Sequence, residues 1–360
     1  MGLPYARERT VGDIAKGVLG GAWTLVAGWM LPTALNLAVF FLAVAPDLRR
    51  VGPVARLWPG SDVDTALLLL VSAVLLGLVL NALQVPLYRV LEGYVLWPAP
   101  VYARGCARHR AAKQALEGRL ELLRLERAGP EGRTEADAAR AAALRADPRI
   151  ARAARRDRTR TTAQRSLLQE ELSRYPADDG QIVPTRLGNA IRRLEEYGHN
   201  RYRLDTQTLW NELTGTAPSQ VRRQAETART SVDFFVALLY GHAAVALVAL
   251  AAVWRAGTPA QLPVTAAVLL ALIPVWYRCA VTSTDEWAAA VRALVNTGRR
   301  PLADSLGLVL PQDLAREREM WMLVTRMSRR PYRDAAVDAF APYRLDPADT
   351  QCPVRGPGSP

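Results

Sequence analysis

The chain has 360 residues, 50% of them hydrophobic and 22% charged, and 46 Lys and Arg against 34 Asp and Glu give a net charge of +12. Three cysteines without a CxxC spacing exclude a disulfide-stabilised scaffold and a thiolate metal site. The basic residues are 44 arginines and only two lysines, an excess of arginine that a GC-rich genome also produces.

Four long runs without a charged residue divide the chain. They cover residues 18–45, 65–88, 234–254 and 259–277. A helix needs about 20 apolar residues to cross a hydrocarbon core of ~30 Å, because each residue adds about 1.5 Å. Buried helices of a soluble core, the alternative, are usually shorter than these runs. The sequence therefore predicts an all-α polytopic membrane protein with four transmembrane helices.

The flanks of these runs indicate an orientation. The first run, at 28 residues, is too long for the apolar region of a cleaved signal peptide. Arginines are dense before it, within 99–231 and after residue 278, and basic segments stay on the cytoplasmic side. The 46–64 loop, which holds three arginines, is the exception. We expect a multi-pass protein of the bacterial cytoplasmic (inner) membrane with both termini in the cytoplasm.

This orientation predicts five regions. They are residues 1–98 with the first two transmembrane helices, a basic helical cytoplasmic domain over 99–231, the other two transmembrane helices over 232–281, C-terminal cytoplasmic helices over 282–345, and a flexible tail over 346–360.

Four polar side chains interrupt the apolar runs: Asn36, Asn81, Gln84 and His242. Polar groups in a membrane often face a water-filled path, so these residues are candidates to line a pore. The alternative is that they join helices through hydrogen bonds worth roughly 1 kcal/mol each. We expect His242 near the start of its span, with its ring reaching the headgroup level.

The 99–231 insertion carries 26 Lys and Arg against 17 Asp and Glu, a net charge of +9. Its first part has a helical pattern, with Leu116, Leu120 and Leu123 on one face. We expect a stalk helix that continues from the second span and ends at the Gly-Pro-Glu-Gly sequence of 129–132.

The densest basic segment follows this break. Five of its arginines, if the segment is one helix, lie on one face at spacings of four, three, four and four: Arg145, Arg149, Arg152, Arg156 and Arg160. Such a face repels itself unless an anion neutralises it, and guanidinium groups bind phosphate through two hydrogen bonds. The alternative is a solvated helix face. Aromatic residues for base stacking are sparse, which argues against sequence-specific reading of bases.

Residues 184–213 predict a compact helical hairpin that seats the insertion on the bilayer. The first helix has an apolar stripe and Gly198 at its end, and Asp205 is placed to cap the second. The stripe consists of Leu187, Ile191, Leu194 and Tyr197.

Part of this stretch resembles a family of uncharacterised bacterial four-span membrane proteins. The residues that carry the resemblance are Pro184-Thr185-Arg186-Leu187-Gly188-Asn189, Tyr197, Arg201-Tyr202, Leu204-Asp205, Leu209-Trp210, Leu306-Gly307-Leu308-Val309-Leu310-Pro311 and Glu317-Arg318-Glu319-Met320-Trp321. The family has Gly after the Arg-Tyr pair and Pro after the Trp, where this chain has Arg203 and Asn211. The resemblance implies a location in the membrane but suggests no particular activity and no catalytic residues.

Two amphipathic helices are expected after the fourth span. The first covers 285–296, capped by Thr284 or Asp285 and stopped by Gly298, and the second starts at Pro311-Gln312-Asp313. Trp287 and Trp321 either rest at the headgroup level or pack on the 184–213 hairpin, and we favour the hairpin.

Catalytic motifs are absent from the sequence. It has no phosphate-binding G-x-x-x-x-G-K-[ST], no G-x-G-x-x-G after a strand and no HExxH. We therefore expect neither an enzyme nor a cofactor or metal.

Two functions fit these features. The first is an oligomeric membrane channel or pore-type effector whose basic domain senses an anionic nucleotide, a nucleic acid or a partner, and anti-phage defence is one setting for such effectors. The second is a non-conducting membrane anchor or scaffold that holds a partner protein or nucleic acid. The expected partners are the lipid bilayer, further copies of the chain and the anionic ligand.

Overall fold

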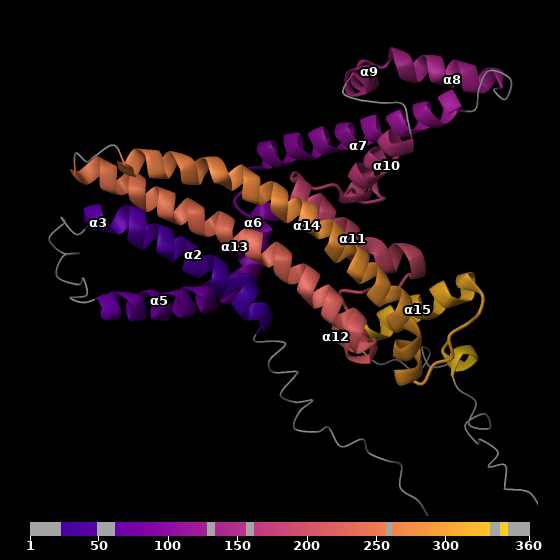
Figure 1. Cartoon of the computed structure of the whole chain (residues 1–360). Helices are drawn as coiled ribbons and strands as arrows, with labels where there is room; N and C mark the ends of the chain where they lie inside the picture. The colour runs from indigo at the N-terminus through magenta and orange to yellow at the C-terminus, as the bar shows by residue number, and fades with distance from the viewer. Residues whose placement is uncertain are drawn as a thin grey trace, which may run out of the picture.

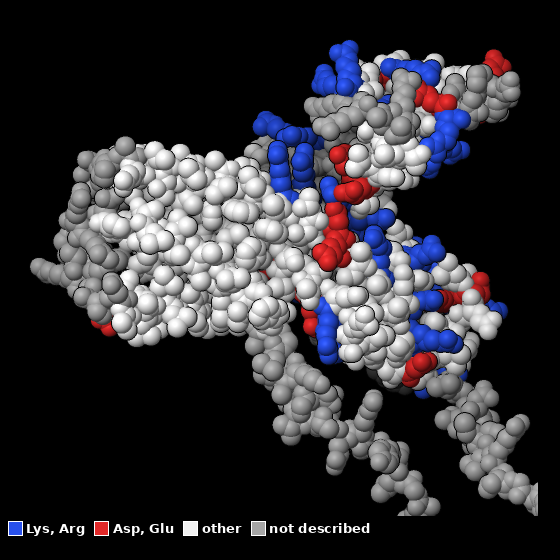
Figure 2. Space-filling view, in the orientation of Figure 1, with Lys and Arg blue, Asp and Glu red and all other residues white. Residues whose placement is uncertain are grey.

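The structure, a computed structural model, describes residues 23–48, 62–127, 134–155, 162–256, 261–331 and 339–344. The described residues form helices joined by turns, with one isolated bridge between Leu308 and Arg344 and no strand. Figure 2 shows an apolar half on one side, while most charged side chains lie over the other, polar half. The expected all-α class is confirmed.

Four helices are long and apolar enough to cross a membrane, as the sequence predicted. The first is built from η1 (Val26–Met30), α2 (Leu31–Val39), η2 (Phe40–Val44) and α3 (Ala45–Leu48), and the others are α5 (Asp62–Ala82), α13 (Ser219–Ala256) and α14 (Gln261–Ser305). They lie side by side in the apolar half (Figure 1).

The first of these helices is irregular, with π-helical turns on both sides of α2. The earlier turn contains Gly28, whose carbonyl would be the partner of residue 32 in a regular helix. Pro32 has no N–H to offer it, so the regular hydrogen-bond ladder is interrupted there. The wider turn accommodates this missing bond.

The helices α13 and α14 extend from the apolar half deep into the polar half (Figure 1). With 38 and 45 residues they are about 57 and 68 Å long at ~1.5 Å per residue. The separate helix expected over 285–296 is therefore wrong. Asp285 pairs with Arg174 instead of capping a helix, and Gly298 lets α14 approach Leu213 closely instead of ending it.

The core of the polar half joins the end of α14 to three further helices. These are α11 (Arg186–Tyr202), α12 (Trp210–Thr216) and α15 (Leu314–Arg329). Trp321 is fully buried in this core beside Leu213 and Leu294, so it packs on the hairpin and does not lie at the headgroup level. The helix α15 begins at Leu314 with Asp313 as its N-cap, close to the start expected at residues 311–313.

The end predicted for α11 is wrong. The helix continues past Gly198, where a side chain would collide with Thr206 and with the carbonyl of Leu204. It ends at Tyr202, and Arg203 follows in the left-handed conformation with φ 62°. Gly198 thus serves close packing rather than helix termination.

The insertion begins with a turn rather than a continuous stalk, which corrects that expectation. After α5 the short α6 (Gln84–Glu92) ends at Gly93, which has φ 97°, and α7 (Ala99–Arg127) then starts anew. Three further helices complete a basic lobe with α7: α8 (Glu135–Ala146), α9 (Pro148–Ala154) and α10 (Thr162–Ser173). The lobe has a small core of its own, formed by Leu122, Leu125, Ala141, Leu144 and Ile150.

Candidate functional site

Of the five arginines predicted to share one helical face, the three that the structure describes do not lie on one continuous helix. The helix breaks at Asp147, whose carboxylate accepts a hydrogen bond from the Arg149 N–H at 2.7 Å and caps α9. Pro148 begins α9, and a proline disfavours the helical conformation in the residue before it. Arg145 therefore belongs to α8, while Arg149 and Arg152 belong to α9.

The described arginines of this segment differ in their partners. Arg145 lies 3.1 Å from Glu126 of α7, and its neighbour Arg140 lies 2.8 Å from Glu121, so both are neutralised within the lobe. Arg149 and Arg152 are exposed and pair with no acidic residue in the described parts of the chain, and the same holds for Arg155. Arg156 and Arg160 lie outside the described residues.

Asn36 and His242 are brought together inside the bundle. The Asn36 side-chain NH₂ donates to the Pro32 carbonyl at 2.8 Å, which turns its oxygen toward Nδ1 of His242, 2.7 Å away. Gly241 leaves room for the amide, because a Cβ there would lie 2.1 Å from the Asn36 nitrogen. His242 is 6% exposed and meets the ring of Trp276 edge-on. The expected snorkelling of His242 is wrong, because its partner lies in the bundle.

Asn81 and Gln84 lie apart from this pair. They line a cavity of about 390 Å³ at the boundary of the apolar half, together with Arg229 and Asp233 of α13. Gln84 accepts a hydrogen bond from Arg229 at 3.2 Å, and Tyr88 donates one to Asp233 at 2.7 Å. The four intramembrane candidates thus divide into a buried pair that joins two helices and a pair that lines a boundary cavity.

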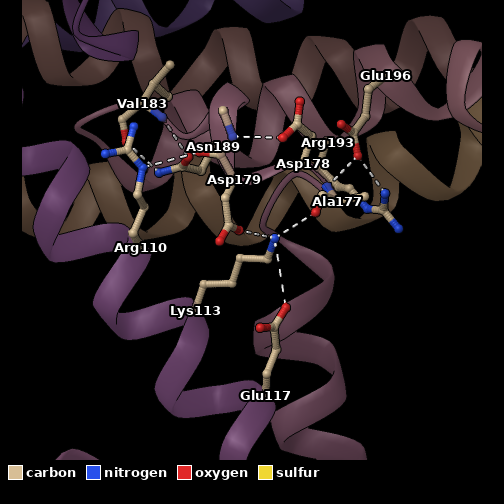
Figure 3. Close-up of polar contacts among 11 residues, drawn as sticks. Arg110, Lys113, Glu117, Ala177, Asp178, Asp179, Val183, Asn189, Arg193 and Glu196 are labelled. Carbon is tan, nitrogen blue, oxygen red and sulfur yellow. Dashed lines mark hydrogen bonds and ion pairs between the residues drawn. The ribbon is translucent and has the colours of Figure 1, made fainter.

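Sequence reasoning missed the contacts that hold the basic lobe to the rest of the molecule. Lys113 of α7 is 4% exposed, and its ammonium group donates to Asp179 at 2.6 Å and to the Ala177 carbonyl at 2.8 Å (Figure 3). Glu196 of α11 accepts from the Ala177 N–H at 2.7 Å. The signal available in the sequence was only that Lys113 is one of two lysines in an arginine-rich chain.

A second connection joins the lobe to α14. The guanidinium of Arg174, just after α10, donates through Nε to Asp285 Oδ1 at 2.9 Å and through Nη2 to Oδ2 of the same carboxylate. Both side chains are partly buried, with 21% and 33% of their surface exposed. A two-point contact between planar groups fixes orientation as well as distance.

A third contact lies at the base of the lobe. His109 of α7 has its Nδ1 3.1 Å from the hydroxyl of Tyr175. Burial, with Arg186 and Arg108 nearby, lowers the pKa of His109 below its usual value. The surroundings therefore favour the neutral ring, because a cation there would be poorly solvated and repelled.

The Pro-Thr-Arg-Leu-Gly-Asn stretch has a structural role. Thr185 caps α11 by accepting from the Gly188 N–H at 3.0 Å. Asn189, which is 1% exposed, accepts from the Val183 N–H and donates to the carbonyls of Val183 and Thr185. Leu187 packs against Trp29 and Val232 of the apolar half. This loop therefore seats α11 on the bundle.

The described residues include no group of three or more His, Cys, Asp or Glu side chains that could hold a metal ion. No protein family, curated protein or solved structure matches the chain in comparisons with known proteins.

Proposed function

We propose that this protein is an oligomeric membrane effector of the channel or pore type, whose basic lobe faces the cytoplasm and binds a polyanion. The observation that carries the proposal is the ion pair between Arg174 and Asp285. It attaches the lobe to α14, and the same helix continues into the apolar half. A movement of the lobe on ligand binding would therefore move α14, which includes one of the membrane spans.

The residues that would bind the polyanion lie on α9 and just after it. Arg149, Arg152 and Arg155 project within two turns, are exposed and pair with no acid in the described parts of the chain. Guanidinium groups bind phosphate oxygens through paired hydrogen bonds. A nucleotide or oligonucleotide supplies such phosphates, and the contact reads the backbone rather than the bases.

A ligand shifts a conformational equilibrium only if it binds one state better than the other. Lys113–Asp179 and Arg174–Asp285 are two of the polar contacts between the lobe and the rest of the described protein. A polyanion that binds α9 would shift the lobe and strain these contacts. We propose that α14 moves in response and changes the arrangement of the apolar half.

The pore of such an effector would form between copies rather than within one. Asn36 and His242 satisfy each other inside the bundle, so they do not offer a lining for an ion path through a single chain. Figure 2 shows Lys and Arg side chains gathered beside the apolar half, where acidic headgroups of the cytoplasmic leaflet attract them.

Planar-bilayer recording of the purified full-length protein tests this proposal. We expect conductance that changes when a single-stranded oligonucleotide or inorganic polyphosphate is added on the side of the lobe. Arg174→Gln and Asp285→Asn should still bind the polyanion but lose the change in conductance. Absence of conductance with every polyanion tested would overturn the effector proposal.

The second candidate, a non-conducting anchor, is favoured by the Asn36–His242 pair. A polar pair buried between two helices strengthens a bundle that has only to hold its position. In that case the protein would bind the oligonucleotide with the same arginines and show no conductance in the same recording.

A further inference from the structure

The cavity that Asn81 and Gln84 line contains polar groups with no partner in the described parts of the chain. The Asn81 side chain forms no hydrogen bond there, although it belongs to an apolar span. The Gln84 oxygen accepts from Arg229, and the NH₂ group of the same amide is left without an acceptor among the described residues. An amide in apolar surroundings costs free energy unless it is hydrogen-bonded. The cavity, of about 390 Å³, therefore favours a polar occupant.

The charges around the cavity alternate in sign along α13. Glu226, Arg229 and Asp233 are spaced by three and four residues, so they share one face of the helix. Asp233, the most buried of them, accepts from Tyr88 and lies 3.9 Å from Arg229. Glu226 is half exposed, and its ion pair with Arg222 is long, at 3.9 Å. One arginine and two acids give the lining a net charge of −1, which disfavours an anion and suits a molecule that also carries a cation.

We propose that this cavity binds the headgroup of phosphatidylethanolamine, with the phosphate on Arg229 and the ammonium on Glu226. Guanidinium groups bind phosphate oxygens through paired hydrogen bonds, and the unpaired amides of Asn81 and Gln84 supply further N–H donors. Glu226 and Arg229 are three residues apart, about 4.5 Å along the helix at ~1.5 Å per residue. The two-carbon link of ethanolamine joins an ammonium to a phosphate over a similar reach.

The cavity lies where the headgroups of a bilayer would lie. Asn81 is in the last turn of the α5 span, Thr24 is at the start of the first span, and Asp233 directly precedes the uncharged run of α13. Three spans thus leave the apolar half around the cavity. Leu78 and Val74, one and two turns before Asn81 on the same face of α5, are exposed. The acyl chains of a bound lipid can lie along them.

The chemistry of the lining separates phosphatidylethanolamine from two other phospholipids. Phosphatidylglycerol is an anion without an ammonium group, so Glu226 and Asp233 oppose its binding. Phosphatidylcholine carries three methyl groups in place of the three N–H donors that Glu226 can accept from. The inference is independent of the proposed function, because it concerns lipid recognition and needs neither conductance nor a polyanion.

Competition between lipids, read by native mass spectrometry, tests the assignment. The full-length protein in detergent is given equal amounts of the three phospholipids with identical acyl chains. We expect it to retain phosphatidylethanolamine over each of the others by about tenfold, the effect of one hydrogen bond to a charged group. Equal retention of the three lipids by the wild-type protein would overturn the inference.

Neutralising Glu226 tests the ammonium site. Glu226→Gln should abolish the preference over phosphatidylcholine and phosphatidylglycerol, because the amide no longer offers a negative charge. Glu286→Gln is the matched control, since Glu286 is an exposed acid on α14 outside the cavity lining, and it should keep the wild-type preference. A wild-type preference in Glu226→Gln would contradict the proposal.

Filling the cavity gives a second variant that should fold normally. Asn81→Leu removes an amide that forms no hydrogen bond within the described protein, so thermal unfolding should be unchanged or shifted upward. Its retention of phosphatidylethanolamine should fall several-fold. Retention at the wild-type level would show that the lipid binds elsewhere and would overturn the assignment to this cavity.

A soluble competitor distinguishes a lipid from a free metabolite of the same chemistry. O-phosphoethanolamine carries the phosphate and the ammonium without acyl chains, so it lacks the contacts along Val74 and Leu78. We expect it not to displace the bound lipid at equal concentration. Displacement would show that the cavity takes a soluble zwitterion and would overturn the assignment to a lipid.

Discussion

Arg174 and Asp285 are 111 positions apart in sequence and form a two-point ion pair between the end of the basic lobe and the middle of α14. The helix α14 passes through residue 285 without a break. The carboxylate that would have capped a new helix is instead bound by a guanidinium from the inserted lobe. The lobe is thereby attached to the longest helix of the protein.

We predict that Arg174→Gln or Asp285→Asn loosens the lobe without unfolding the protein. The pair is partly exposed, so each substitution should lower the free energy of unfolding by only about 1 kcal/mol. Hydrogen exchange should rise in α10 and stay unchanged in α15. The double variant should lower the free energy of unfolding by less than the sum of the two single losses. If the losses are strictly additive, the pair contributes nothing to stability.

We predict that Asn36→Ala and His242→Ala are energetically coupled. Each leaves the other side chain buried without its partner, so each should destabilise the bundle by about 1 kcal/mol, with a coupling of ~0.5–1.5 kcal/mol. The measurement is unfolding in mixed micelles at increasing SDS. Leu247→Ala, on a side chain that is 64% exposed, serves as the control for loss of apolar surface.

We predict that Arg203→Gly stabilises the protein. Arg203 ends α11 with φ 62°, a conformation that costs a side-chain-bearing residue about 1 kcal/mol and that glycine adopts freely. Thermal unfolding should shift upward. Arg201→Gly, in the last turn of the same helix, should lower stability by a similar amount because glycine is a poor helix former.

We predict that the contact between α7 and Tyr175 at the base of the lobe weakens in acid because of His109. Its folded-state pKa is lowered, so the unfolded state binds the proton more readily. The contribution of the neutral ring is complete above the unfolded pKa of about 6.5 and is lost as the pH falls toward the lower folded value. Exchange in α7 near Tyr175 should therefore rise between pH 7 and 5, and His109→Gln should abolish this pH dependence.

We predict that polyanion binding depends on the unpaired arginines and not on the paired ones. Arg149→Gln with Arg152→Gln should weaken oligonucleotide binding and reduce the salt slope by about 1.4, since each phosphate contact to a single strand contributes ~0.7. Arg140→Gln with Arg145→Gln is the matched control, because those side chains are neutralised by Glu121 and Glu126. Equal losses of oligonucleotide affinity in both double variants would indicate that only the net charge of the lobe matters.

Local sequence patterns predicted those features that depend on residues close to one another. The four apolar helices follow from the length of the uncharged runs, and the start of α15 was expected at residues 311–313 because the signals for a helix start lie within one turn. The break at Asp147 was missed, although the Asp-Pro pair at 147–148 is itself a local signal for a helix start.

The sequence by itself determined that the chain has four helices fit for a membrane and a basic insertion, because hydrophobic length and charge are sums over neighbouring residues. Tertiary structure alone decided that Asn36 binds His242, that Lys113 is buried, and that Asp285 serves an ion pair within an unbroken α14. Each depends on a partner far along the chain. Burial and hydrogen-bond satisfaction are set by what packs nearby, which no local pattern contains.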